Sequence, residues 1–468
     1  MFMRMIYDDS LAQAAYLIGC QATGEAILFD PLRDVDRYIE LAEANGLKII
    51  AAAETHIHAD FVSGARELAD RIGARVYVSA EGGDDWQSKW VGGYDHQTLR
   101  HGDSFRIGKI RFQAVHTPGH TPEHIVYIVT DEGGGANEPI GVASGDFLFV
   151  GDLGRPDLLE TAAKQAGAME VGAHSLYNSL GSLDSLPEFV QVWPGHGAGS
   201  ACGKALGAVP MSTIGYEKRF NPALGLAGDE ARFVSFILDG QPEPPMYFGD
   251  MKRINRDGPA VLGGLPAPEH IDAVDVANLD PNEITIIDTR PWEDFISGHV
   301  PGSLSFPLGN MFCTDVGSMV GVDDRICVIA EPASLESIVR QLVRIGCDHV
   351  EKWCPASDIT GSPSASAGLE ECDISSVLNG LGAGESFLDV RRLAEFAEGH
   401  MPGASNISHT RLRGRLDELP QADRLYVSCR SGKRSARACA YLQRLGRDVV
   451  NIRGGWLAWA QAGGSVER

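Results

Sequence analysis

The sequence predicts an α/β protein made of several domains, on three observations. Its 468 residues are about three times the ~150 residues that are usual for a single domain. Over roughly the first 240 residues, short apolar runs alternate with helical stretches. Further along, a segment of about 20 residues occurs twice, which predicts two more domains of one fold.

The elements of the first region follow from its apolar pattern. Residues 14–19, 25–30 and 48–54 are short apolar runs, which favour strands. Residues 34–46 and 61–73 have the apolar spacing that is typical of helices. We therefore expect a mixed α/β domain over residues 1–245.

A proline-rich segment marks the end of that domain. Pro242, Pro244 and Pro245 precede a short basic stretch, a composition typical of an inter-domain linker or a wrapping arm. We place a boundary near residue 250 and assign residues 246–264 to the linker.

The internal repeat defines the rest of the chain. Asp288 and His299 are eleven residues apart, and so are Asp389 and His400, in the segments 286–308 and 387–407. These copies predict two related domains, at residues 265–360 and 373–468, joined by the small and polar residues of 361–371.

Composition excludes several classes of function. With 40 basic and 63 acidic residues, the net charge of −23 disfavours nucleic acid and anionic membrane surfaces. No apolar stretch approaches the ~20 residues of a membrane helix, and the first residues do not read as a signal peptide. The nine cysteines never occur in CxxC spacing, so we expect reduced thiols in a cytoplasmic protein. We also expect a homo-oligomer.

Four turns carry candidate metal ligands. His56, His58 and Asp60 directly follow the apolar run 48–54. His120, Asp146 and His196 lie in later glycine-containing turns that follow apolar runs. Strand ends of α/β sheets meet at one edge, so this order of residues predicts a metal site there.

These motifs resemble those of the metallo-β-lactamase fold superfamily over about residues 1–230, and within it the branch of glyoxalase II and persulfide dioxygenase. The resemblance implies an αββα sandwich and a metal held by His56, His120 and Asp146. Hydrolases of the superfamily close a second metal site with a histidine at the position of Phe61, which has no lone pair to offer. Two imidazoles and one carboxylate are typical of non-heme Fe(II) oxygenases, so we expect one Fe(II) per chain.

Other residues near the motifs keep more than one interpretation. His58 could complete a three-histidine zinc site with His56 and His120. His196 is expected to line the pocket and Asp60 to accept a hydrogen bond from a ligating histidine. Cys202 is either an ordinary loop thiol or a carrier of persulfide sulfur. The weak candidates for substrate binding are Arg155, Lys218 and Arg219.

The last domain carries a candidate nucleophile. Cys429 follows the apolar run 424–428 and precedes a helix, so backbone N–H groups, the helix dipole and basic side chains favour its thiolate form. The loop residues after it are Arg430, Ser431, Gly432, Lys433 and Arg434. With the RGGW motif at 453–456, this segment resembles a rhodanese domain, which implies that Cys429 carries sulfane sulfur.

The first copy of the repeat departs from this pattern. Glu331 stands where the cysteine would be, and a carboxylate cannot accept sulfane sulfur. We therefore interpret residues 265–360 as an inactive rhodanese-like domain.

The whole chain resembles fusions of a persulfide dioxygenase with two rhodanese domains, the first of them inactive. The resemblance implies that glutathione or coenzyme A persulfide is oxidised with O2 to sulfite, and that Cys429 transfers sulfane sulfur to form or use thiosulfate, in sulfide detoxification. The alternative is a zinc thioesterase similar to glyoxalase II with an accessory sulfurtransferase.

Overall fold

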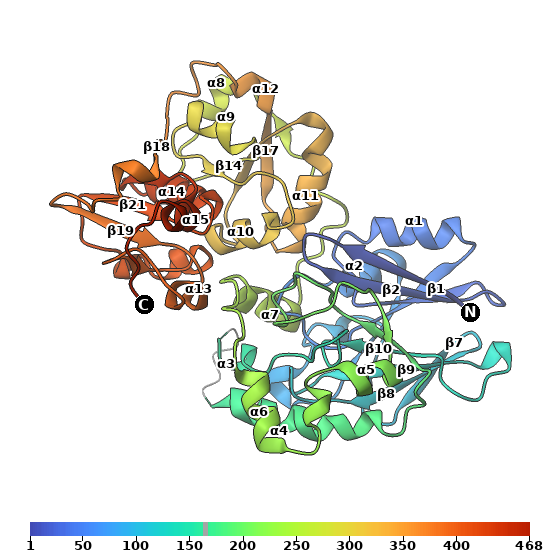
Figure 1. Ribbon diagram of the computed structural model, residues 1–468. Coiled ribbons are helices and arrows are strands. Elements are labelled where there is room, and N and C mark those ends of the chain that lie inside the picture. The colour runs from blue at the N-terminus through green and yellow to red at the C-terminus, as the bar shows by residue number, and fades with distance from the viewer. Residues whose placement is uncertain (162–166) are drawn as a thin grey trace. The chain divides into compact units, whose positions relative to one another are not determined.

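The computed structural model describes residues 1–161 and 167–468 of the chain (Figure 1). These residues form two compact units. Unit 1 consists of Met1–Pro244 and Phe248–Leu265, and unit 2 consists of Pro245–Tyr247 and Pro266–Arg468.

Unit 1 contains two six-stranded sheets. The first sheet has the order β1-β2-β3-β4-β5-β6, with β1 Phe2–Asp8, β2 Gln13–Cys20, β3 Glu25–Phe29, β4 Lys48–Ala53, β5 Arg75–Ser79 and β6 His96–Leu99. The second has the order β12-β11-β10-β9-β8-β7, with β7 Ser104–Ile107, β8 Ile110–His116, β9 Ile125–Asp131, β10 Gly141–Gly145, β11 Gln191–Pro194 and β12 Ser212–Thr213.

The two sheets of unit 1 share one apolar core. Phe29 of β3 packs against Phe112 of β8 and Tyr127 of β9, with ring centroids 5.5 and 5.0 Å apart. Along β8, residues alternate between buried and partly exposed positions, as expected for a strand with one face on the core. Burial of these aromatic rings therefore stabilises the contact between the sheets.

Helices cover the outer faces of both sheets. On the first sheet, α1 (Asp36–Ala44) and α2 (Ala65–Ile72) pack against β4. On the second, α4 (Ala168–Ser179) and α6 (Glu230–Leu238) contribute Leu176 and Phe233 to a separate apolar cluster. Shorter helical segments are α3 (Leu158–Thr161) and α5 (Ile214–Phe220). The predicted αββα sandwich is confirmed.

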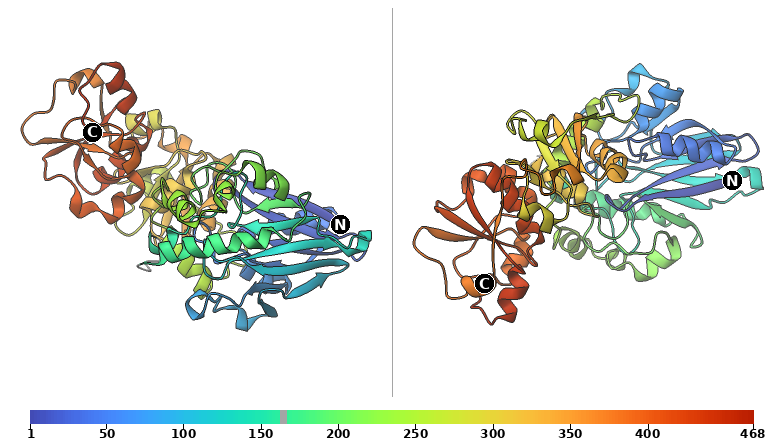
Figure 2. Two further views of the ribbon diagram at one scale, coloured as in Figure 1. Left: turned by 60° about the horizontal axis from the view of Figure 1, so that its bottom comes forward. Right: turned by 90° about the horizontal axis from the view of Figure 1, so that it is seen from above.

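Unit 2 contains two five-stranded parallel sheets with the same strand order. Figure 2 draws the segment of the first sheet in yellow to orange and that of the second in orange to red. The first has the order β13-β17-β16-β14-β15, with β13 Glu269–His270, β14 Thr285–Asp288, β15 Leu304–Ser305, β16 Ile326–Ala330 and β17 Val350–Pro355. The second has the order β18-β22-β21-β19-β20, with β18 Glu370–Cys372, β19 Glu385–Asp389, β20 Ser405–Asn406, β21 Arg424–Ser428 and β22 Asp448–Ile452.

Helices connect the strands of each sheet in unit 2. Around the first sheet they are α8 Ala273–Ala277, α9 Trp292–Ser297, α10 Phe312–Met319, α11 Leu335–Arg344 and α12 Ala356–Ile359. Around the second they are α13 Leu393–Ala397, α14 Lys433–Arg444 and α15 Gly455–Gln461.

The repeated residues of the sequence have a structural role. Asp288 ends β14 and forms an ion pair with Arg290 at 2.7 Å, and Asp389 ends β19 and pairs with Arg391 at the same distance. In both copies the arginine also donates to the carbonyl before the repeated histidine. Buried charges need such pairing, so the shared motif fixes the turn after the strand in each copy.

Residues 248–263 belong to unit 1 and pack against its α2. This segment begins with α7 (Phe248–Asp257). After the helix, Arg66 donates to the Pro259 carbonyl at 2.8 Å, and the Glu67 carboxylate accepts from the backbone N–H groups of Leu262 and Gly263. Within the described residues, no helix is long and apolar enough to cross a membrane.

Candidate metal centre and sulfur-transfer site

Three buried side chains at strand ends of unit 1 form a candidate metal site. His56 follows β4, His120 follows β8 and Asp146 follows β10. One possible ligand atom from each lies within 4.8 Å of the others. The structure therefore brings together the three residues that the resemblance implies as metal ligands.

Hydrogen bonds turn both imidazoles toward the carboxylate. The Thr55 hydroxyl donates to Asp30 at 2.9 Å, so its oxygen accepts from the Nδ1 of His56, also at 2.9 Å. The Nδ1 of His120 donates to the Arg155 carbonyl at 3.2 Å. Each Nε2 therefore keeps its lone pair for a metal, as in other metal-ligating histidines.

The carboxylate of Asp146 fits a cation between these nitrogens. Its Oδ2 lies 3.9 Å from the Nε2 of His56 and 3.5 Å from the Nε2 of His120. This buried oxygen has no hydrogen-bond partner among the described residues. A buried acceptor without a partner is costly, and a divalent cation bound by the two histidines would satisfy it.

The charges of the three groups suit metal binding. Burial lowers the pKa of His56 and of His120, so both imidazoles are neutral. Burial alone raises the pKa of Asp146, but the adjacent His196 outweighs it, and the net shift is downward. Two neutral imidazoles and an ionised carboxylate are the forms that bind metal.

His196 lies behind the triad, between two carboxylates. Its Nδ1 is 2.8 Å from Asp146 Oδ1, and its Nε2 is 2.7 Å from Asp60 Oδ2. Burial lowers the pKa of His196, but Asp146 and Asp60 together raise it well above its usual value. A Cβ at Gly195 would lie 2.6 Å from Asp146 Oδ1, so only glycine fits before this histidine.

Cys202 lies close to His196 and Asp60. A ligand atom from each of Asp60, His196 and Cys202 lies within 4.8 Å of the others, and all three residues are buried. Burial raises the pKa of the Cys202 thiol well above its usual value. Cys202 is therefore a neutral thiol close to the residues that support Asp146.

His58 joins a different buried cluster. Its Nε2 lies 3.1 Å from Asp30 Oδ1 and 3.7 Å from Glu54 Oε2. Burial lowers the pKa of His58, but the neighbouring carboxylates raise it to about 9. The Phe61 ring packs against the His58 ring with centroids 4.3 Å apart. In this orientation the Nε2 of His58 faces the carboxylates of Asp30 and Glu54 and not the triad of His56, His120 and Asp146.

The basic residues that we expected near the substrate already have acidic partners. Arg155 is buried and pairs with Asp157, and its backbone carbonyl supports His120. On α5, Lys218 lies 3.8 Å from Asp184 and Arg219 lies 3.6 Å from Glu188.

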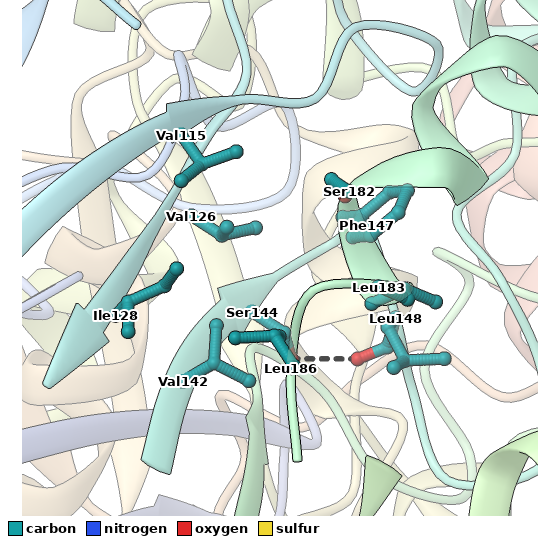
Figure 3. Close-up of a pocket in the computed structure, with 10 residues that line it drawn as sticks. All are labelled: Val115, Val126, Ile128, Val142, Ser144, Phe147, Leu148, Ser182, Leu183 and Leu186. Atoms are coloured by element: carbon teal, nitrogen blue, oxygen red, sulfur yellow. Dashed lines mark hydrogen bonds between the residues drawn. The ribbon is translucent and has the colours of Figure 1, made fainter. Parts of the chain in front are cut away.

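A small apolar cavity in unit 1 is lined by side chains of β8, β9 and β10 and of residues 147–148 and 182–186, and its lining does not include His56, His120 or Asp146 (Figure 3). This cavity of about 10 Å³ is lined by apolar side chains and two serines, and Ser144 donates to the Leu148 carbonyl at 2.7 Å. Such a volume holds about one water molecule, so the cavity is part of the core and not a substrate site.

In unit 2, Cys429 lies at the junction of β21 and α14. The sulfur is buried and accepts from the Gly432 N–H at 3.2 Å, and the Ser435 hydroxyl oxygen lies 3.5 Å from it. A Cβ at Gly455 would lie 2.2 Å from the Cys429 carbonyl oxygen. The RGGW motif therefore allows the chain of α15 to pack directly on the cysteine loop.

The charged residues of this loop differ in their surroundings. Arg434 binds Glu395 through two contacts of 2.6 and 2.8 Å. Arg430, Ser431 and Lys433 are exposed. Two basic side chains are thus available to an anionic substrate at the loop, while Arg434 anchors the loop to α13.

A chain of hydrogen bonds begins at Ser435, beside the sulfur. The Ser435 hydroxyl donates to the Asn451 Oδ1 at 2.6 Å, and the Asn451 Nδ2 donates to the Glu371 Oε1 at 2.6 Å. The same carboxylate oxygen accepts from the Trp292 indole N–H at 3.0 Å. Since a carboxylate only accepts, Glu371 fixes which way the Asn451 amide points.

The corresponding loop of the first copy has no thiol. Glu331 follows β16 and lines a cavity of about 100 Å³ together with Thr289, Arg290 and Leu308. The four cysteines of this copy, Cys313, Cys327, Cys347 and Cys354, are buried.

Four residues of these sites were not singled out from the sequence. Asp30 directly follows β3, so its position at a strand end could have marked it as a candidate site residue. Thr55 directly precedes His56, and Glu371 ends the segment 361–371 between the two copies. Neither has a spacing to other residues that would mark a functional role. Asn255, which contacts the turn after His56 from α7, has no sequence signal at all.

Two family models match segments of the chain that contain the residues of both candidate sites. Residues 9–196 match the family model described as the metallo-beta-lactamase superfamily, and residues 373–462 match that of the rhodanese-like domain. The crystal structure of a metallo-beta-lactamase from Staphylococcus aureus subsp. aureus COL is 39% identical, with 76% of this chain and 99% of that chain covered and a TM-score of 0.68.

Two kinds of curated relatives are similar to this chain. The mitochondrial persulfide dioxygenase ETHE1 of Homo sapiens is 26% identical over 231 residues, which cover 49% of this chain and 78% of that protein. A beta-lactamase hydrolase-like protein of Xylella fastidiosa (strain 9a5c) is 27% identical over 293 residues, which cover 56% of this chain and 61% of that protein.

Proposed function

Because the chain belongs to the metallo-beta-lactamase superfamily and carries a rhodanese-like domain, we propose that it is a persulfide dioxygenase joined to a sulfurtransferase. The observation that carries the proposal is the unpartnered Asp146 Oδ2, which faces two histidine nitrogens. Similarity to ETHE1, whose name describes a persulfide dioxygenase, supports the choice of reaction.

The metal of this proposal is one Fe(II) per chain, held by His56, His120 and Asp146. Held by two imidazoles and one carboxylate, iron would supply open coordination positions for oxidation of a sulfur substrate by O2. Phe61 supports a single metal, because its ring gives no ligand to a second one. The chain's own contribution is orientation: Thr55 and Arg155 fix the two imidazoles, and His196 fixes Asp146.

The proposed substrate is a low-molecular-weight persulfide of glutathione or coenzyme A. One persulfide, one O2 and one water give one thiol, one sulfite and two protons. The terminal sulfur is oxidised and O2 is reduced, so no further electron donor is needed. This reaction would serve sulfide detoxification in the cytoplasm.

Cys429 performs the second reaction of the proposal. Its thiolate attacks the terminal sulfur of a persulfide, a new S–S bond forms on Cys429, and the thiol leaves. Sulfite then attacks that terminal sulfur, which gives thiosulfate and restores the Cys429 thiolate. The Gly432 N–H and the exposed Arg430 and Lys433 favour anionic partners at this loop.

The first rhodanese-like copy is inactive in this proposal. Glu331 has no sulfur to form a persulfide, and the cysteines of this copy are buried. Burial raises the pKa of both Cys327 and Cys354 to about 12, which keeps them as neutral thiols.

A zinc thioesterase similar to glyoxalase II is the second candidate, favoured by the similarity to a beta-lactamase hydrolase-like protein. A hydrolase does not use O2, so the two candidates respond differently to its removal. The test is thiol release from glutathione persulfide and from a glutathione thioester, each with and without O2. The dioxygenase requires O2 and the persulfide, whereas thioester cleavage that continues without O2 would favour the hydrolase.

A further inference from the structure

Helix α7, labelled in Figure 1, contacts the turn that follows His56. The Nδ2 of Asn255 donates to the His58 carbonyl at 2.8 Å and to the Phe61 carbonyl at 2.7 Å. Its Oδ1 accepts from the Ser63 N–H at 2.9 Å. Both amide protons and the oxygen are thus used on one turn, which fixes the orientation of the side chain.

These three backbone groups depend on Asn255 because the turn is buried. Asn255, His58, Phe61 and Ser63 are each at most 5% exposed, so water cannot replace the amide. Leaving such a group without a partner costs about 1–3 kcal/mol. The side chain therefore holds residues 58–63 in their observed conformation.

The turn held in this way includes Asp60, which leads to the metal triad. Asp60 lies between the two carbonyls that Asn255 binds, and its Oδ2 lies 2.7 Å from the Nε2 of His196. The Nδ1 of His196 lies 2.8 Å from the Oδ1 of Asp146. The backbone of the turn and two hydrogen bonds of His196 thus connect Asn255 of α7 to a ligand of the candidate metal site.

The start of the same turn is held separately. The Ile57 N–H donates to Glu123 Oε1 at 2.8 Å.

Helix α7 is held by contacts of its own. Lys252 of α7 places its Nζ 3.3 Å from the centroid of the Trp86 ring, and the Trp90 indole N–H donates to the Asn255 carbonyl. These contacts hold α7 against the rest of unit 1, beside the turn that Asn255 binds.

We propose that Asn255 is a positioning residue for the metal centre, which acts through the turn 58–63, Asp60 and His196 on Asp146. Residue 255 lies outside both segments that match a family model, residues 9–196 and 373–462. The metal centre is therefore completed by the segment that follows the metallo-beta-lactamase region. This inference rests on the proposed metal site, but not on the reaction that the metal supports.

The test compares Fe(II) binding by full-length wild-type protein, Asn255→Ala, Asn255→Asp and the control Arg253→Ala, by anaerobic competition with a chelator. Arg253 lies on the same helix with its side chain 54% exposed. Loss of a residue that supports metal ligands typically weakens metal binding about 10–100-fold, so we expect at least about a tenfold loss for both Asn255 variants and none for Arg253→Ala. Affinities within twofold of wild type would overturn the inference, whereas a wild type that binds no iron would contradict the proposed metal site itself.

Hydrogen exchange of the metal-free protein gives a readout that does not depend on metal. In Asn255→Ala the Ser63 amide loses its acceptor and should exchange faster. Asn255→Asp keeps an acceptor, so Ser63 should stay protected, and Ile57 should stay protected in both variants because Glu123 holds it. Equal loss of protection throughout unit 1 would show a general defect of folding and would rule out a positioning role.

Discussion

The Nδ1 of His196 lies 2.8 Å from the Oδ1 of Asp146, on the side of the carboxylate opposite the two triad histidines. This contact leaves Oδ2 as the oxygen that faces them. Because Asp60 binds the other nitrogen of His196, one imidazolium separates two buried carboxylates. The stability of the metal-free site should therefore depend on His196.

Replacement of His196 by alanine should destabilise unit 1. It leaves Asp60 and Asp146 buried without their shared cation, and breaking a buried ion pair in this way costs about 3–5 kcal/mol. The measurement is thermal unfolding of metal-free protein. His174→Ala is the matched control, because its ion pair with Glu230 is exposed and should contribute less than about 1 kcal/mol. Equal small effects would argue against the ion-pair account.

Asp146→Ala should separate the two activities. Loss of the carboxylate removes a metal ligand, so O2 uptake with glutathione persulfide should vanish. Sulfur transfer from thiosulfate to cyanide should persist at the wild-type rate, because that reaction needs the Cys429 loop and no metal. Simultaneous loss of both reactions in a folded protein would contradict independent sites.

Cys429→Ser should give the opposite result. Cyanide-dependent sulfur transfer should disappear, because Glu331 offers no second acceptor, while O2 uptake continues and the product shifts from thiosulfate to sulfite. Product analysis at matched O2 uptake measures this shift. Substantial residual transfer would instead assign sulfur-carrying capacity to Cys202 or to the first copy.

Glu371→Ala should lower sulfurtransferase kcat/KM about tenfold, which corresponds to roughly 1.4 kcal/mol, the scale of one lost hydrogen bond to a charged group. The change frees the Asn451 amide and so the Ser435 hydroxyl beside the sulfur. Glu370→Ala is the control, since the Glu370 carboxylate is exposed and pairs with Arg424. If both variants keep wild-type kinetics, the hydrogen-bond chain has no role in the reaction.

Glu123 should make stability depend on pH. Burial raises its pKa to about 7 from 4.5, so between these values the folded state binds more protons than the unfolded state. Stability should then fall as pH rises from 4.5 to 7, by at most about 3 kcal/mol. Glu123→Gln removes this titrating group. The free energy of unfolding of the variant, relative to that of the wild type, should therefore increase as pH rises from 4.5 to 7. A difference that stays constant from pH 5 to 7.5 would contradict the shifted carboxyl.

The place of six candidate ligands after strands predicted a metal site, and the family resemblance selected three of them as the triad. His56, His120 and Asp146 lie after β4, β8 and β10, whose ends meet at one edge of the sandwich. The sequence left open whether His58 joins His56 and His120 at the metal, since the turn after β4 sets the direction of each ring. Contacts with Thr55 and Asp30 make that choice in the structure.

The surroundings of the sites were less predictable. Asn255 lies 192 residues from Ser63 in the chain, and nothing in its neighbourhood marks it. Arg155 was a weak candidate for substrate binding, but the carboxylate of Asp157, two residues later, binds its guanidinium group. Such contacts depend on the path of the chain in three dimensions and not on local pattern.

Metal content and O2 stoichiometry of anaerobically purified protein test the central claim most directly. The measurement combines metal analysis with O2 uptake during turnover of a known amount of glutathione persulfide. We expect about one iron per chain and about one O2 consumed for each persulfide oxidised, as the mononuclear triad requires. Two tightly bound zinc ions per chain, with thiol release that continues without O2, would contradict it.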